Sequence, residues 1–67
     1  MAQRSTRNKL KWQGDKAIMK VEQLQQHLKN IYDLAGGGSD MVNKSLPGLV
    51  EMSELMLTTL RAFRAAL

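Results

Sequence analysis

The cationic residues near the N-terminus are the side chains of this chain whose type and spacing could do chemistry. Residues 1–20 hold six lysines and arginines against one acidic residue, a net charge of +5, whereas residues 21–67 hold four against five, a net charge of −1. Ammonium and guanidinium groups bind phosphates and carboxylates through charge and hydrogen bonds. If this end of the chain has a partner, the asymmetry predicts an anionic one, either a nucleic acid or an acidic protein surface. The alternative is a solvated tail that aids solubility.

The only tryptophan, Trp12, lies inside this basic segment. An indole among cationic residues can stack on a nucleic-acid base or anchor a protein interface. It can also pack across the end of a helical bundle, and a chain reversal would bring Phe63 and Leu67 to that end. We expect the packing role for Trp12.

The remaining reactive residue types do not form a catalytic or metal-binding set. His27 would need an orienting carboxylate to act as a base, and Glu22, five residues earlier, lies on another face of a helix. The glycines at 36–38 lack the lysine and hydroxyl residue of a phosphate-binding loop. With no cysteine and one histidine, the chain has no thiolate ligand and no multi-histidine set. We therefore expect a protein that is not an enzyme, binds no cofactor or metal, and uses His27 as a polar residue beside an interface.

A first helix is predicted over residues 15–35. Its apolar residues alternate in spacings of three and four, as in the seam of a coiled coil: Ala17, Val21, Leu24, Leu28, Ile31 and Ala35. Asp15 is a suitable N-cap and Gly36 a suitable stop. Alternatively the helix starts at Ser5 or Thr6, which places Gly14 inside it at a cost of about 1 kcal/mol relative to alanine. The shorter helix is preferred, which leaves residues 1–11 as a flexible basic arm.

A second helix is predicted over residues 45–67, after a loop at 36–40. Ser45 would cap it, with Pro47 in the first turn, where a missing N–H does little harm. The alternative start lies near Met41, capped by Ser39 or Asp40, with a kink at Pro47. The apolar stripe of this helix comprises Leu49, Met52, Met56, Leu60, Phe63 and Leu67.

These elements predict an all-α fold in which residues 12–67 form an antiparallel two-helix hairpin. The second helix is apolar over more than half of its circumference, since Val50 and Leu57 widen the stripe on one side and Leu55 and Ala66 on the other. A lone hairpin would leave much of that surface in water, and burial is worth roughly 25 cal/mol per Å². We expect a homodimer forming a four-helix bundle, with a tetramer as the other assembly that buries this surface. The expected core and oligomer interface comprises Val21, Leu24, Leu28, Ile31, Leu49, Val50, Met52, Met56, Leu57, Leu60, Phe63 and Leu67.

The antiparallel hairpin would also return the end of the second helix to the basic end of the first. The candidate contacts to an anion or nucleic acid are Arg4, Arg7, Lys9, Lys11, Lys16, Arg61 and Arg64. No apolar run is longer than Leu55–Leu57, too short to span a bilayer, and the polar start does not resemble a secretory signal. The sequence therefore predicts a cytoplasmic homo-oligomeric module for protein–protein interaction and regulation. The alternative is a DNA- or RNA-binding regulator that uses the basic N-terminal arm.

Overall fold

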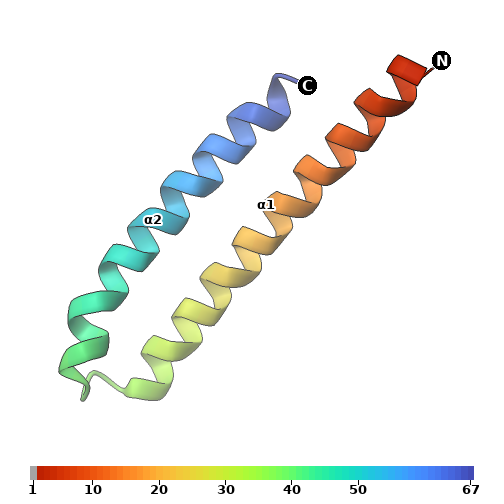
Figure 1. Cartoon of the computed structure of the whole chain (residues 1–67). Helices are drawn as coiled ribbons and strands as arrows, with labels where there is room; N and C mark the ends of the chain where they lie inside the picture. The colour runs from red at the N-terminus through yellow and green to blue at the C-terminus, as the bar shows by residue number, and fades with distance from the viewer. Residues whose placement is uncertain (1) are drawn as a thin grey trace.

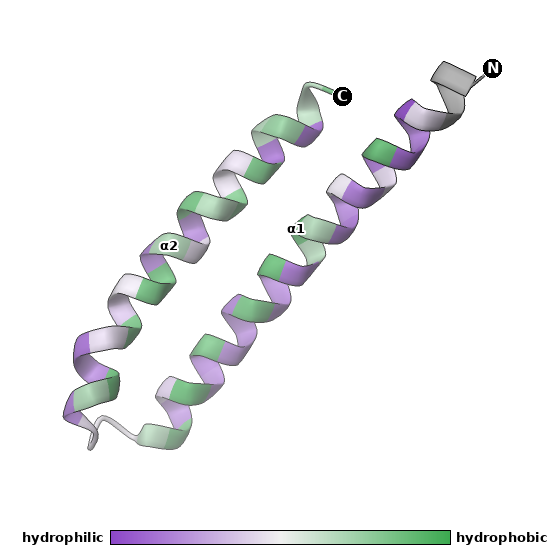
Figure 2. Cartoon of the chain, viewed as in Figure 1, coloured by the Kyte–Doolittle hydropathy of each residue, from purple (hydrophilic) through white to green (hydrophobic). Residues whose placement is uncertain are grey.

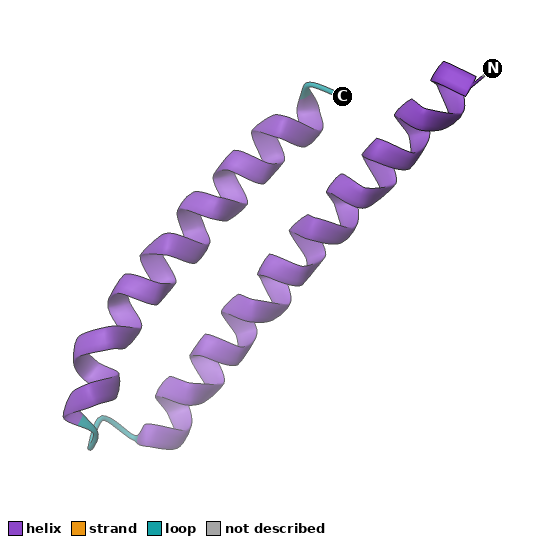
Figure 3. Cartoon of the chain, in the orientation of Figure 1, coloured by secondary structure: helices purple, strands orange, loops and turns teal. Residues whose placement is uncertain are grey.

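The computed structural model describes the backbone of residues 2–67 and the side chains of residues 6–67, and it shows two long helices packed side by side. Helix α1 spans Ala2–Ala35 and helix α2 spans Asp40–Ala65. They run antiparallel and form an elongated hairpin of 56 × 17 × 12 Å, with both chain ends at the same end of the molecule (Figure 1). All regular structure in the described chain is helical (Figure 3). The predicted all-α antiparallel hairpin is confirmed.

Helix α1 begins at Ala2, so the expected start at Asp15 is wrong and the longer alternative is nearer to the structure. Residues 2–11, expected to form an arm, are the first turns of the helix. Asp15 does not cap a helix, because it lies inside α1, and its carboxylate instead accepts a hydrogen bond from Arg64 of α2. Gly14 is buried against the same arginine, so the close approach of the two helices offsets the low helix propensity of glycine.

The helices are connected by a tight turn over residues 36–39. Helix α1 ends before Gly36, as predicted, and both Gly36 and Gly37 have positive φ angles of 60° and 77°. The N–H of Gly36 donates to the carbonyl of Tyr32, and the N–H of Gly38 donates to that of Ala35, each at 3.1 Å. These positions need glycine because the left-handed conformation is strained for residues that carry a Cβ atom.

Helix α2 starts at Asp40, so the preferred start at Ser45 is wrong and the alternative start near Met41 is supported. The hydroxyl of Ser39 accepts a hydrogen bond from the N–H of Val42 at 3.3 Å and caps the helix. The side-chain amide of Asn43 donates to the carbonyl of Gly37 at 2.9 Å, which ties the first turn to the loop. These contacts stabilise the extra turn although Pro47, now inside the helix, cannot donate a backbone hydrogen bond.

A thin core lies where the two helices meet. Val21 and Leu28 of α1 and Leu46 and Leu57 of α2 are buried, and so is Ser53, which is the most buried of the described polar residues, with 2% of its surface exposed. Ser53 donates to the carbonyl of Val50 at 2.7 Å and accepts a hydrogen bond from the amide of Gln25 at 3.3 Å. The buried hydroxyl is therefore satisfied within α2 and also linked to α1.

The predicted stripes coincide only in part with this core. Val21, Leu28 and Leu57 are buried as expected, while Val50, Leu60 and Leu67 are half-buried. The other predicted residues are exposed, because the contact between the helices is centred on the line through Leu46 and Ser53 rather than on the predicted stripe of α2. This second group comprises Leu24, Ile31, Leu49, Met52, Met56 and Phe63. Apolar residues therefore occur along both helices well outside the buried core (Figure 2).

Candidate interaction surfaces

The two sides of the hairpin differ in their side chains. The residues on each side can be assigned from a seven-residue repeat along the two helices. Gly14, Val21 and Leu28 mark the line of contact on α1, with Leu46 and Ser53 on α2. In a right-handed helix, residues three and four positions after a contact residue flank it on opposite sides. Because the helices run antiparallel, the "three after" positions of both helices lie on one side of the hairpin and the "four after" positions on the other.

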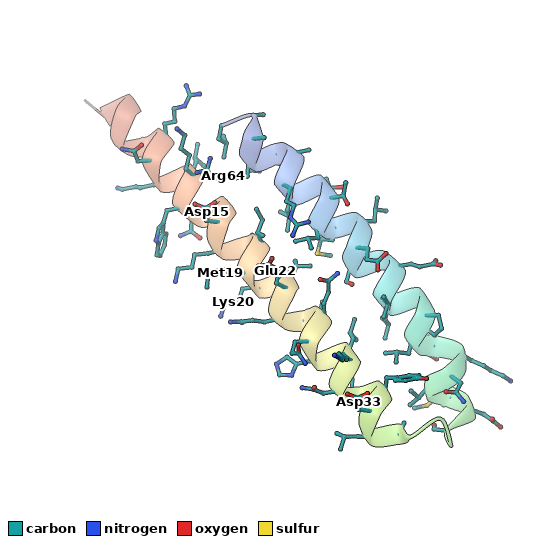
Figure 4. The ribbon with its side chains drawn as sticks, turned by 180° about the vertical axis from the view of Figure 1, so that it is seen from behind. Asp15, Met19, Lys20, Glu22, Asp33 and Arg64 are labelled. Atoms are coloured by element: carbon teal, nitrogen blue, oxygen red, sulfur yellow. The ribbon has the colours of Figure 1, made fainter. Side chains whose placement is uncertain are left out.

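Toward the free ends of the hairpin, the "four after" side is crossed by ion pairs between the helices. Arg64 donates from Nε to Oδ1 of Asp15 at 2.8 Å and from Nη2 to Oδ2 at 3.5 Å. Arg61 Nη2 lies 3.4 Å from Oε2 of Glu22, and Figure 4 shows Asp15 and Arg64 directed toward each other between the helices. This side is therefore closed by ion pairs toward the free ends of the hairpin.

Nearer the loop, the same side carries an open groove of about 530 Å³. Tyr32 of α1 and Pro47 and Val50 of α2 line it, above the buried Leu28 and Leu46. The groove is mainly apolar. Among the described side chains, no buried polar atom lacks a hydrogen-bond partner. Nothing in its lining indicates a particular ligand.

The "three after" side is apolar, and we call its six large residues the apolar face. Each is between 43% and 54% exposed, so each flanks the core without being covered by it. The smaller residues Ala17 and Val42 occupy the other "three after" positions of the two helices. No described "three after" position therefore carries an ionisable residue. The apolar face comprises Leu10, Leu24 and Ile31 of α1 and Leu49, Met56 and Phe63 of α2.

The outer surface of α2 continues the apolar face. Met52 and Leu55 are about two-thirds exposed, and with Met56 they line a shallow hollow of about 340 Å³. In the single hairpin, much of the apolar surface of α2 is therefore exposed to water, as expected from the sequence. Many exposed apolar side chains on a small chain indicate a surface that contacts a partner.

The described residues predicted to contact an anion fall into two groups, arginines that bond to groups within the chain and lysines that form no ion pair. Arg61 and Arg64 do return to α1, but both are paired with carboxylates. Arg7 donates from Nε to the carbonyl of Leu67 at 2.7 Å, which anchors α1 to the end of the chain. Lys9, Lys11 and Lys16 lie on α1 with no ion pair among the described side chains, and the side chain of Arg4 lies outside the described residues.

Trp12 does not pack across the end of the hairpin, so the expected contact with Phe63 or Leu67 is wrong. The residue is 57% exposed, and the ammonium Nζ of Lys16 lies 5.0 Å from the centre of its ring. The reason is register: Trp12 lies two residues before the contact residue Gly14, which directs it away from α2. Phe63 is itself about half exposed, on the apolar face.

Three residues of the contact line are not predicted by the apolar periodicity. The preferred helix bounds place Leu46 at the start of a helix and Gly14 outside one, and the apolar stripes omit Ser53, whereas all three are buried between the helices. The seven-residue spacing from Leu46 to Ser53 was the available signal. A serine and a glycine do not stand out in a search for apolar periodicity, so this signal is weak.

Neither a metal site nor a membrane-spanning segment is found in the part of the chain that the structure describes. No group of three or more histidine, cysteine or acidic residues gathers there, and His27 is exposed. Neither helix combines the length and the apolar character that a bilayer crossing needs. No protein-family model, curated protein or solved structure matches this chain. Function is therefore inferred from the surfaces of the hairpin.

Proposed function

We propose that this chain is a non-enzymatic interaction module that pairs with a second copy through the apolar face. Two hairpins joined in this way form a four-helix bundle, in which each α2 lies against the partner hairpin. The observation that carries the proposal is the set of six half-exposed apolar residues in seven-residue spacing on one side of the hairpin. A seven-residue repeat of apolar residues on both helices has the period of coiled-coil packing.

The size of the apolar face suits a protein–protein interface. From Leu10 to Ile31 the face is roughly 30 Å long, and two adjacent helices are roughly 20 Å wide, which gives about 600 Å² in projection. A standard interface takes about 800 Å² from each partner. These 800 Å² correspond to about a seventh of the 5428 Å² accessible surface of the hairpin. Two such faces together bury about 1,200 Å², the lower end of the range for specific interfaces, so the face is large enough for a dimer.

A second copy of the chain fits this face better than a charged partner does. A two-fold axis sets the same patch against itself, so a self-association patch must tolerate its own charges. The described positions of the face carry none, so two copies meet without repulsion. Among the described side chains the hairpin also buries only four apolar ones, and a chain of 67 residues gains stability from a partner subunit.

Sedimentation velocity of the full chain between 1 and 100 µM tests the proposal. We expect a mass of twice 7.5 kDa at the higher concentrations. Met56→Lys should shift the chain toward monomer, because it places a charge in the centre of the face. Tyr32→Lys, an equal charge change at a similarly exposed residue on the other side, should leave the dimer intact. A folded monomer at 100 µM would contradict the proposal.

A further inference from the structure

A strip of cationic and aromatic residues runs along α1 on the side that faces away from α2. Lys9, Trp12, Lys16 and Lys20 follow one another at intervals of three, four and four residues, which places them on one face of the helix. Met19 lies beside them, and Figure 4 shows Met19 and Lys20 directed away from α2. We call the four residues the basic–aromatic strip.

The charge of the strip is uncompensated because the nearby carboxylates are engaged elsewhere. Asp15 and Glu22, the acidic residues nearest the strip on α1, pair with Arg64 and Arg61 on the "four after" side of the hairpin. Among the described side chains, no carboxylate lies within 4.0 Å of the three lysines of the strip. The ion pairs therefore separate the charges of α1, with the acidic groups facing α2 and the lysines facing outward.

Trp12 supplies a flat apolar surface in the middle of this positive charge. Its indole is 57% exposed, and Lys16 lies over the ring at 5.0 Å. An exposed indole next to a cation is the arrangement that holds an unpaired base and its phosphate, since the base stacks on the ring and the ammonium contacts the phosphate. From Lys9 to Lys20 the strip is about 16 Å long, which corresponds to about five nucleotides of a stacked strand.

We infer that the basic–aromatic strip binds single-stranded nucleic acid. A duplex keeps the faces of its bases stacked and offers the indole nothing to stack on. An anionic membrane would need a continuous apolar face, and here only Trp12 and Met19 are apolar. The strip lies on the opposite side of α1 from α2 and mainly outside the apolar face, so this inference is independent of self-association.

The fluorescence of Trp12, the only tryptophan, reports binding directly. We expect a 15-nucleotide oligo(dT) or oligo(U) to quench the emission of the full chain at 50 mM salt, whereas a blunt 15-base-pair duplex quenches it far less. Three lysine–phosphate contacts predict a slope of about −2 for log K against log salt concentration. Equal quenching by the duplex, no quenching at all, or a blue shift with phosphatidylglycerol vesicles without oligonucleotide binding would overturn the inference.

Matched variants separate the strip from overall charge. With a labelled oligonucleotide, Trp12→Ala should weaken binding about tenfold, and Trp12→Phe should restore most of the affinity. Lys16→Gln with Lys20→Gln should reduce the salt slope by about 1.4, whereas Lys29→Gln with Lys44→Gln, of equal net charge, should leave affinity and slope nearly unchanged. Circular dichroism checks that each variant is folded. Equal losses from both lysine pairs would contradict a localised site.

Discussion

The side chain of Arg64 lies across the backbone of Gly14. A Cβ atom added at Gly14 would come within 3.2 Å of Cδ of Arg64, and the guanidinium of Arg64 donates to Asp15, the next residue of α1, at 2.8 Å. The absence of a side chain at Gly14 thus lets an arginine pass between the helices with its stem packed and its charge paired. This contact closes the hairpin near the free ends of both helices.

Gly14 is expected to respond in opposite directions to small and large substitutions. Gly14→Ala should stabilise the hairpin by up to about 1 kcal/mol, since alanine favours the helix and the flexible Arg64 can shift by a few tenths of an ångström. Gly14→Leu should destabilise it by about 1–3 kcal/mol, because the side chain forces the helices apart. Thermal unfolding followed by circular dichroism measures both. A leucine variant as stable as the alanine variant would show that the helices do not approach closely here.

The two interhelical arginines should contribute unequally to stability. Arg61 pairs with Glu22 where both side chains are more than half exposed, so Arg61→Ala should cost less than about 0.5 kcal/mol. Arg64→Ala should cost more, about 1 kcal/mol, since it also removes the stem that packs on Gly14. Urea unfolding of the two variants gives the comparison, and equal losses would indicate that the packing of Arg64 adds nothing.

Truncating a buried side chain of α2 should destabilise the hairpin far more than truncating a side chain on its outer surface. Leu57→Ala deletes a buried side chain and should cost about 2–4 kcal/mol, a large share of the stability of so small a domain. Leu55→Ala, two residues earlier and 68% exposed, should cost the hairpin itself much less. Circular dichroism of both variants at low concentration, where self-association is weakest, makes the comparison. Similar losses would place the helix contact elsewhere.

The turn should be sensitive to substitution at Gly37 and insensitive at Gly38. Gly37 has a φ of 77°, so Gly37→Ala should destabilise the hairpin by about 1 kcal/mol. Gly38 has no positive φ, and a Cβ atom there would meet only the carbonyl oxygen of Ala35 at an ordinary 3.6 Å. Gly38→Ala should therefore leave the melting temperature unchanged or raise it slightly. A destabilising Gly38 variant would argue against this turn geometry.

Self-association should make the melting temperature depend on protein concentration. If folding is linked to dimer formation, raising the concentration from 5 to 500 µM should raise the midpoint by several degrees, because mass action favours the folded dimer. Met56→Lys should lower the midpoint and weaken the dependence. A midpoint that is independent of concentration for the unsubstituted chain would count against the dimer.

The sequence by itself determined the class of fold and the reversal of the chain. Apolar residues in helical spacing on both sides of Gly36 require two helices, and glycines that accept positive φ angles require a turn between them. These signals are local, so they can be found without knowing what each helix packs against. The asymmetry of charge and the excess of apolar surface on α2 follow from composition in the same way.

Only the tertiary structure decided which residues lie between the helices. The periodic stripe of α2 pointed to Leu49, Met56 and Phe63, yet the contact line passes through Ser53, whose hydroxyl is satisfied by its own helix and by Gln25. The burial of Gly14 inside α1 depends in the same way on Arg64, which packs on it from 50 positions along the chain. Such partners are remote in sequence, and a wide apolar surface is compatible with several rotations of the helix. Packing against the second helix selects one of them.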